Sequence, residues 1–361
     1  MKKIKFMSVL AAGVLALSLV SCDLLNSKEP ETPPSKDYKA GDVALTKIKI
    51  NGVEYGKTEE VYVTGNQGVK IVGKTNNSYG AFPEGRTVTL SPYIMGKYEV
   101  TQELYTAVMT GQKVTVDGTE YTLEAEPFRC KGTGDYPIVT GETQKYRPAE
   151  NINWYDAVWF CNALSEKQNL TKAYNITEIT VEDNHIVNAT VSLVQNANGY
   201  RLPTEAEWEC AARGGDPTAA AWDYFLSGAA TKEDADSVFW HWGNKATGIT
   251  DGTYPLAGEP GYGTHETGKK APNTLGIYDM SGNVLEWCYD WEGAITVEEK
   301  GVKNPTGAES GTKRIIRGAS WRHGPDPLYE RYSSTPNLPK DSETVSKSND
   351  SKGFRIVRSV K

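Results

Sequence analysis

Tryptophan, glycine and proline are distributed in a way that restricts the folds open to this chain. All nine Trp lie between Trp154 and Trp321, and the 361 residues include 35 Gly and 18 Pro. Gly and Pro favour turns and interrupt long helices, while buried indole rings supply a large apolar area from few residues. The sequence therefore predicts short regular elements and much irregular backbone, with an aromatic core in the second half, and excludes a long helical bundle.

The charge balance narrows the class of partner. Lys and Arg number 39 against 46 Asp and Glu, which gives a formal net charge of -7. Loss of an N-terminal leader that carries Lys2, Lys3 and Lys5 would make the remaining chain still more acidic. A nucleic-acid-binding protein needs a basic face, so no nucleic-acid partner is expected.

The N-terminus has the features of a bacterial lipoprotein leader. A cationic start is followed by an apolar run, Phe6 to Val20, which is too short to span a bilayer comfortably, and then by Ser21 and Cys22. We interpret residues 1–21 as a signal peptide, with the Cys22 thiol lipidated as a membrane anchor and residues 22–44 as a tether. The alternative is an ordinary signal peptide with an incidental Cys. The expected location is that of an exported bacterial lipoprotein at the outer membrane or cell surface.

The other cysteines permit two interpretations. They are Cys130, Cys161, Cys210 and Cys288. An even count in an exported protein allows two disulfides, but Cys161 and Cys210 fall at core-facing positions of predicted helices. We therefore predict buried free thiols, with disulfides as the alternative. No Cys-x-x-Cys pair indicates a zinc ribbon or a thioredoxin-type site.

Capping residues predict three helices. Thr101 precedes a helix over 102–109, and Asn153 precedes a longer helix whose apolar residues recur at i, i+3, i+4 and i+7. Thr204 begins a capping-box helix that ends at Gly214-Gly215. Short strands are expected early in the chain, at 45–50, 61–72 and 86–90. Two later strands, at 315–316 and 354–357, are able to pair with each other.

Six motifs follow one another in order. They are Glu99-Val100-Thr101, Asn153 to Ala157, Gly199 to Glu209, Tyr278 to Trp287, Arg317 to Trp321 and Gly353-Phe354-Arg355. Together they resemble the formylglycine-generating-enzyme, or sulfatase-modifying-factor, domain over roughly residues 60–358. The resemblance implies an α+β domain with a C-type lectin-like fold of the formylglycine-generating-enzyme type, rich in irregular structure. We assign residues 45–361 to this domain.

The same resemblance bears on catalysis. The family's enzymes oxidise a substrate cysteine with two copper-binding cysteines, and this chain has His323 and Leu328 at those positions, with no Cys after Cys288. Cu(I) prefers thiolate ligands, so neither copper nor formylglycine generation is expected. A related branch holds iron with a His-x3-His-x-Glu pattern. The four His of this chain do not form that pattern, so no iron is expected either.

One segment matches the family's calcium loop. In that loop, side-chain oxygens of the first and last residues and carbonyl oxygens of the middle two coordinate the ion, at positions that correspond here to Asp279, Gly282, Val284 and Glu286. Oxygen ligands in an irregular loop suit Ca²⁺, so the resemblance implies a calcium site. The alternative is that Glu286 accepts backbone N–H bonds near Trp287 instead.

The segment from about 320 to 352 has few aliphatic residues and is expected to lack regular structure. Such a segment inside a compact domain is usually functional or disordered. It begins with Trp321, and the residues after it are charged, rigid or aromatic groups suited to contacts, namely Arg322, His323, Pro325, Asp326, Pro327, Leu328 and Tyr329. We assign a ligand-binding face to these residues, together with Ser333 and Ser334.

The leader, the lectin-type domain without catalytic cysteines and this altered segment together resemble the variable proteins of diversity-generating retroelements. In those systems, randomised adenines in template Asn codons give Arg, His, Pro, Asp, Leu, Tyr, Ser or Thr, but never Lys, Glu, Gln, Met or Trp. Residues 322–329 fit that set, with Gly324 also allowed, whereas Glu330 does not and is assigned to the scaffold. The alternative is an ordinary divergent surface loop.

The sequence thus predicts a lipid-anchored, non-catalytic, monomeric protein that binds an unknown protein or other ligand at a variable face. Trp321 is expected to form the floor of that face. Arg317 and Arg355 are expected to be buried against acids such as Glu286 or Asp290, or else to be plain surface strand residues. Two other functions stay open: an enzyme of the same superfamily with unrecognised chemistry, and a structural envelope lipoprotein with a fixed partner.

Overall fold

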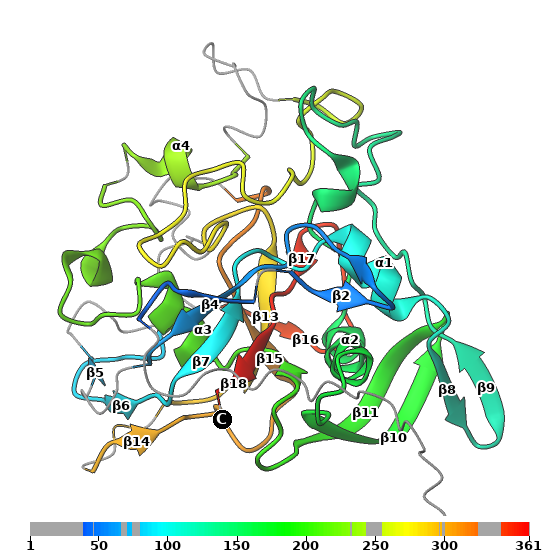
Figure 1. Cartoon of the computed structure of the whole chain (residues 1–361), viewed down its shortest axis with the longest axis horizontal. Coiled ribbons are helices and arrows are strands. Elements are labelled where there is room, and N and C mark those ends of the chain that lie inside the picture. Colours follow the sequence, from blue (N-terminus) through cyan, green and yellow to red (C-terminus); the bar gives the residue numbers. More distant parts are fainter. Residues whose placement is uncertain are drawn as a thin grey trace, which may run out of the picture. The chain divides into compact units, whose positions relative to one another are not determined.

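The computed structural model describes residues 39–45, 47–65, 71–73, 80–231, 233–242, 255–295, 297, 300–323 and 341–360 (Figure 1). The predicted signal peptide, Cys22 and residues 23–38 of the tether lie outside these ranges, as do residues 324–340 of the variable segment. Among the described residues, no helix has the length and apolar character needed to cross a membrane.

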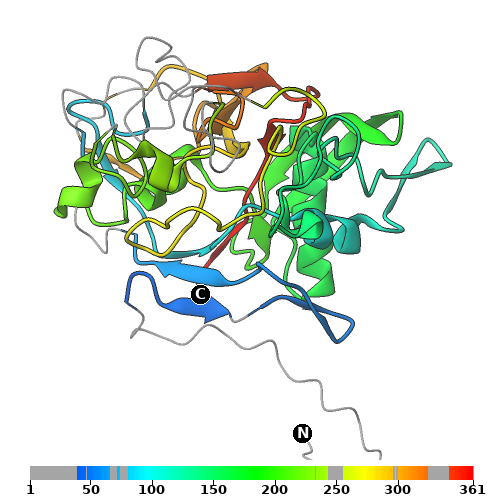
Figure 2. The ribbon, with the colours of Figure 1, turned by 90° about the horizontal axis from the view of Figure 1, so that it is seen from above.

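A five-stranded antiparallel sheet holds the C-terminal strand between two earlier parts of the chain. The order is β1-β4-β7-β18-β12. Figure 2 shows the red C-terminal segment passing through the middle of the ribbon. Every residue of β4 and β7 is buried, so both faces of this sheet are covered. The bounds are β1 Val43–Leu45, β4 Glu60–Val63, β7 Tyr93–Gly96, β18 Val357–Ser359 and β12 Tyr200–Arg201.

A four-stranded sheet carries the last three family motifs. Its order is β16-β15-β13-β17, with β17 parallel to β13 and the other pairs antiparallel. The predicted pairing of 315–316 with 354–357 is wrong, because β15 pairs with β13 and β16 while Val357 belongs to the other sheet. The bounds are β16 Asp341–Thr344, β15 Lys313–Arg317, β13 Leu285–Trp291 and β17 Lys352–Gly353.

The three predicted helices form where their caps place them. The Thr101 hydroxyl accepts from Leu104 N at 3.3 Å, and the Asn153 side chain accepts from Asp156 N at 2.9 Å. Thr204 forms a capping box. The helices and 3-10 turns are α1 Gln102–Met109, α2 Trp154–Lys167, α3 Glu205–Ala212, α4 Ala235–Val238, Gln144–Tyr146 and Ala220–Asp223.

The remaining strands form small peripheral sheets. One has the order β14-β6-β5, and three are two-stranded hairpins, β2-β3, β8-β9 and β10-β11. The strand expected at 45–50 and the tight turn at Asn51-Gly52 correspond to the β2-β3 hairpin, whereas the hairpins β8-β9 and β10-β11 were not predicted from the sequence. The bounds are β2 Lys49–Ile50, β3 Val53–Glu54, β5 Ile71–Val72, β6 Thr87–Thr89, β8 Lys113–Val116, β9 Thr119–Thr122, β10 Tyr174–Glu182, β11 His185–Leu193 and β14 Val302–Lys303.

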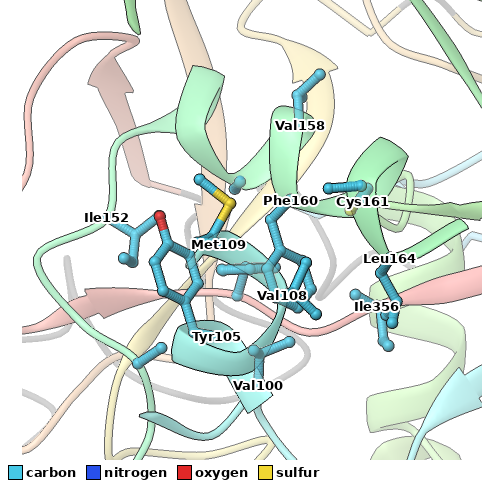
Figure 3. Packing of buried hydrophobic residues seen from close by; sticks show 14 of the residues in the cluster. Val100, Tyr105, Val108, Met109, Ile152, Val158, Phe160, Cys161, Leu164 and Ile356 are labelled. Atoms are coloured by element: carbon cyan, nitrogen blue, oxygen red, sulfur yellow. The ribbon is translucent and has the colours of Figure 1, made fainter. Parts of the chain in front are cut away.

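The largest hydrophobic core lies where α1 packs against α2 (Figure 3). The rings of Tyr105 and Phe160 stack with centroids 5.3 Å apart, and Phe354 meets Phe160 edge-on at 5.1 Å. Trp154 and Trp287 join the same core, whereas Trp208 and Trp222 belong to neighbouring clusters. Aromatic side chains thus bridge the helices to the motif that contains Phe354.

The cysteine prediction is confirmed for the four Cys that the structure describes. Cys130, Cys161, Cys210 and Cys288 are all buried free thiols. Cys161 lies in α2 and Cys210 in α3, and both are fully inaccessible to solvent.

Candidate ligand-binding face

The structure describes the first three residues of the predicted ligand-binding face, Trp321, Arg322 and His323. They follow β15 through a turn in which Gly318 and Ala319 both have positive φ, at 94° and 57°. This backbone conformation bends the chain at the end of the strand. The other predicted residues lie outside the described ranges, namely Pro325, Asp326, Pro327, Leu328, Tyr329, Ser333 and Ser334.

Trp321 is fixed at the bottom of this face. Its backbone N–H donates to Asn283 O at 3.0 Å, and its indole Nε1 donates to Asp350 O at 2.8 Å. Its ring meets Tyr262 edge-on at 5.0 Å and Tyr136 at 6.4 Å between centroids. Only 1% of Trp321 is exposed. It is therefore placed as a floor beneath other side chains rather than as an exposed contact.

Arg322 lies over that floor and is held by a buried acid. Its Nε and Nη2 donate to Asp350 Oδ1 at 2.8 Å and Oδ2 at 2.5 Å, while its guanidinium carbon lies 4.4 Å from the centroid of the Trp321 ring. The Tyr136 hydroxyl also donates to Asp350 Oδ2. Burial raises the pKa of Asp350, but the hydrogen bonds from Arg322 and Tyr136 outweigh that effect and hold the pKa below its usual value. Asp350 is thus an ionised, buried anchor.

His323 is tied back to the turn before it. Its Nδ1 accepts from Ser320 N at 3.0 Å and lies 2.8 Å from Ser320 Oγ, and its carbonyl oxygen accepts from Trp242 N at 3.0 Å. Burial lowers the pKa of His323 to about 4, so the imidazole is neutral near pH 7. His323 therefore stabilises the start of the segment.

The four described cysteines are buried thiols whose pKa is raised. Burial raises the pKa of Cys130 and of Cys210 to about 12, and it also raises the pKa of Cys161 and Cys288. A buried thiol with a raised pKa is a poor source of the reactive thiolate. Within the described ranges, no group of three or more His, Cys, Asp or Glu side chains is placed to hold a metal ion.

The segment that matches the calcium loop surrounds a buried ion pair. Arg355 donates to Glu286 through Nε at 2.7 Å and Nη2 at 2.6 Å, and Trp208 Nε1 donates to the same carboxylate at 2.8 Å. Neither side chain of the Arg355–Glu286 pair is exposed. The predicted burial of Arg355 against Glu286 is confirmed, whereas Arg317 pairs with Glu205 and Glu209.

This arrangement does not fit Ca²⁺. Both oxygens of Glu286 are already engaged, and Asp279 Oδ2 accepts from Gly268 N at 2.7 Å. Asp279 Oδ1 is buried without a hydrogen bond, and burial is the main cause that raises the pKa of this carboxyl to about 6. Ca²⁺ takes six to eight oxygen ligands, and Gly282 and Val284 contribute at most their carbonyls. The resemblance predicts calcium at these residues, whereas their contacts in the structure favour no bound ion.

Chelation tests that prediction. We expect EDTA to leave the midpoint of thermal unfolding unchanged, and added CaCl₂ not to raise it, because Arg355 already neutralises the charge of Glu286. Differential scanning fluorimetry with and without chelator measures both effects, with MgCl₂ as the matched divalent control. A midpoint that rises with Ca²⁺ concentration alone would show a calcium site, since a ligand stabilises the state that binds it.

The fold and the ordered motifs define the class of this protein. Residues 52–360 match the model of the sulfatase-modifying factor enzyme 1-like domain, and the chain belongs to that family. The predicted α+β, C-type lectin-like fold of the formylglycine-generating-enzyme type is confirmed.

The proteins to which this chain is similar include a variable protein, a chaperone and an enzyme. The chain is similar to the solved structure of Treponema denticola variable protein 1, with 30% identity, a TM-score of 0.65, and 86% of this chain and 97% of that one covered. It is also similar to the Chaperone protein LppX of Paenibacillus barcinonensis, at 36% identity over 65% of this chain and 71% of the relative. The Formylglycine-generating enzyme of Thermomonospora curvata is 31% identical over 67% and 76%. The family thus includes a variable protein as well as enzymes.

Sequence reasoning missed three residues that build this face. Asp350, Tyr136 and Tyr262 come from segments far apart in the chain and meet only at Trp321 and Arg322. Asp350 lies just before the Gly353 motif, which is the single local signal that would have pointed to it.

Proposed function

We propose that this protein is an exported, lipid-anchored, non-catalytic binding protein whose segment after Trp321 is diversified to change its ligand. The observation that carries the proposal is the fixed platform under the start of that segment, where Trp321 and Asp350 hold Arg322 in place. The similarity to Treponema denticola variable protein 1, over nearly all of that chain, supports the same function.

A rigid platform suits a diversified surface. Trp321 is anchored by two hydrogen bonds and two aromatic neighbours, so side chains beyond it can change without disturbing the core. Preorganisation also limits the entropy lost when a ligand binds. The ligand, a protein or another molecule, would contact the diversified side chains, and the protein would act as a monomer.

The lack of catalysis follows from what replaces the family's copper-binding cysteines. His323 stands at one of those positions and supplies an imidazole in place of the thiolate that Cu(I) prefers. Leu328 stands at the other and offers no lone pair to a metal. The four described thiols are buried and remain protonated near neutral pH because burial raises the pKa of each.

Anchoring would come from the leader. Lipidation of Cys22 after removal of residues 1–21 would tether the domain to a membrane through a polar, Pro-containing stretch. An outer-membrane or cell-surface location would then expose the ligand-binding face to ligands outside the cell.

DNA sequencing tests the proposed diversification. The region that encodes residues 310–361, with its flanks, would be sequenced from many independent clones. We expect changes confined to adenine-matched positions within codons 322–329, constant codons for Trp321 and Glu330, and a nearby near-copy rich in Asn codons beside a reverse transcriptase gene. An invariant segment without such a near-copy would overturn diversification and favour a fixed partner or an enzyme.

A further inference from the structure

We propose that Trp321, Asp350, Tyr136 and Tyr262 form a subsite for a guanidinium group, which this chain fills with its own Arg322 and which a ligand arginine enters when residue 322 is small. The proposal rests on the proposed function, because it concerns one constant part of the same ligand-binding face.

The contacts of Arg322 are those of a recognition site rather than of a loose surface ion pair. Two guanidinium nitrogens reach the two oxygens of Asp350, at 2.8 and 2.5 Å, and the planar group lies 4.4 Å from the centroid of the Trp321 ring. Bidentate hydrogen bonding and stacking on an aromatic face are the two ways in which proteins distinguish guanidinium from other cations. An ammonium group is a point charge and cannot make both hydrogen bonds in one plane.

The acid at the centre of the subsite is built into the core. Asp350 is 1% exposed, and its own backbone oxygen accepts from Trp321 Nε1 at 2.8 Å. The hydroxyl of Tyr136, a residue far from Asp350 in the sequence, donates to the Asp350 carboxylate. The Tyr262 ring packs edge-on against Trp321, with centroids 5.0 Å apart. These interactions position the carboxylate without any help from Arg322. The Arg322 side chain, in contrast, is 44% exposed and so has a path to solvent.

Under the proposed diversification, the residues that form the subsite stay constant, whereas residue 322, which fills it, changes. A Trp codon cannot arise from the randomised Asn codons, and Tyr136, Tyr262 and Asp350 lie outside residues 322–329. Position 322 lies inside, so Ser, Thr or Gly would replace Arg322 in sibling proteins. Each such protein would keep a buried carboxylate beside an aromatic ring without the guanidinium that hydrogen-bonds to it, and Arg129 would act on that carboxylate through its charge alone. Asp350 is buried, and a buried charge without its partner is unfavourable, so a cationic group from a ligand would be favoured there.

In the experiment, a substitution of Arg322 in the full mature chain empties the subsite, and a small molecule with a guanidinium group is then added. N-acetyl-arginine methylamide is the probe, and N-acetyl-citrulline methylamide, which has the same shape but no charge, is the matched control ligand. We expect Arg322→Ala to bind the arginine probe at least about tenfold more tightly than the unaltered chain and than Arg322→Ala combined with Asp350→Asn. The citrulline probe should not bind any of the three. Isothermal titration calorimetry measures the affinities.

Thermal unfolding gives a second readout. The arginine probe should raise the unfolding midpoint of Arg322→Ala, and of Arg322→Ser if the Ala variant folds poorly, while leaving the unaltered chain unchanged. Lys113→Ala is the matched control, because it also removes the cation of an ion pair, and both Lys113 and Glu120 are more than half exposed. Equal responses of the Arg322 variants, Lys113→Ala and the unaltered chain would overturn the subsite, as would equal binding of the citrulline probe.

This test is independent of the proposed diversification. If the probe binds the Arg322 variants but the encoding DNA is invariant, the guanidinium subsite stands and the diversified function falls. If the DNA varies but neither Arg322 variant responds to the probe, the function stands and Arg322–Asp350 is a structural ion pair only.

Discussion

Replacing Arg355 with Met is expected to lower the free energy of unfolding by about 3–5 kcal/mol. Arg355 and Glu286 are both fully buried and joined by two hydrogen bonds of 2.7 and 2.6 Å. Without Arg355, the Glu286 carboxylate keeps only the hydrogen bond from Trp208, and the carbonyl oxygens of Gly96 and Tyr278 lose their guanidinium donors. Urea denaturation followed by Trp fluorescence measures the change.

An exposed ion pair provides the control for this experiment. Lys113 Nζ lies 2.6 Å from Glu120 Oε1, but the two side chains are 51% and 58% exposed. Solvent screens such a pair, so Lys113→Met should change the free energy of unfolding by less than about 1 kcal/mol. If Arg355→Met costs no more than Lys113→Met, the buried pair does not hold the two sheets and the calcium-loop motif together.

Local signals explain which parts of the fold were predictable. The caps Thr101, Asn153 and Thr204 each satisfy backbone N–H groups within three residues of themselves. A helix start of this kind depends on its neighbours in sequence and little on the rest of the chain. The start of each of these three helices was accordingly predicted from the sequence alone, and the glycines after α3 marked the end of that helix.

Sheet pairing was not predictable in the same way. β13 is buried over its first four residues, so it lacks the alternation of apolar and polar residues that marks a half-buried strand. β17 joins β13 and β18 joins β7, although only three residues separate these two short strands in sequence. The chain changes sheets at Phe354-Arg355-Ile356 because the Phe354 ring enters the α1–α2 core while Arg355 reaches Glu286. Such a switch depends on contacts that no local pattern contains.

In the candidate site, too, the residues that belong to sequence motifs were predictable, and those brought together only by the fold were not. The ordered motifs indicated that Trp321 would be a floor and that Arg355 would be buried, since both belong to segments with a fixed place in the family. Asp350 and Tyr136 carry no motif and meet Arg322 only through the fold. A long-range ion pair between a diversified position and a constant acid has no sequence signature, so the guanidinium subsite required the structure.

Replacing Trp321 with Ala is expected to lower the free energy of unfolding by about 3–5 kcal/mol, because it removes a buried aromatic side chain and leaves a cavity. Trp321 is 1% exposed, packs against Tyr262 and Tyr136, and donates its indole N–H to Asp350 O at 2.8 Å. Thermal and urea unfolding of the variant measure the loss. Because the floor also positions Asp350, the Arg322 ion pair should be weakened at the same time.

The control for this prediction is an aromatic residue assigned to the diversified segment rather than to the scaffold. Tyr329→Ala also removes an aromatic ring, but at a position assigned to the variable face, where a surface substitution should change the free energy of unfolding by no more than about 0.5 kcal/mol. The contrast between two aromatic positions eight residues apart follows from the proposed function, in which Trp321 supports the fold and Tyr329 contacts the ligand. Equal losses at both positions would mean that the segment after Trp321 is part of the core, and a protein could not then vary that segment to change its partner.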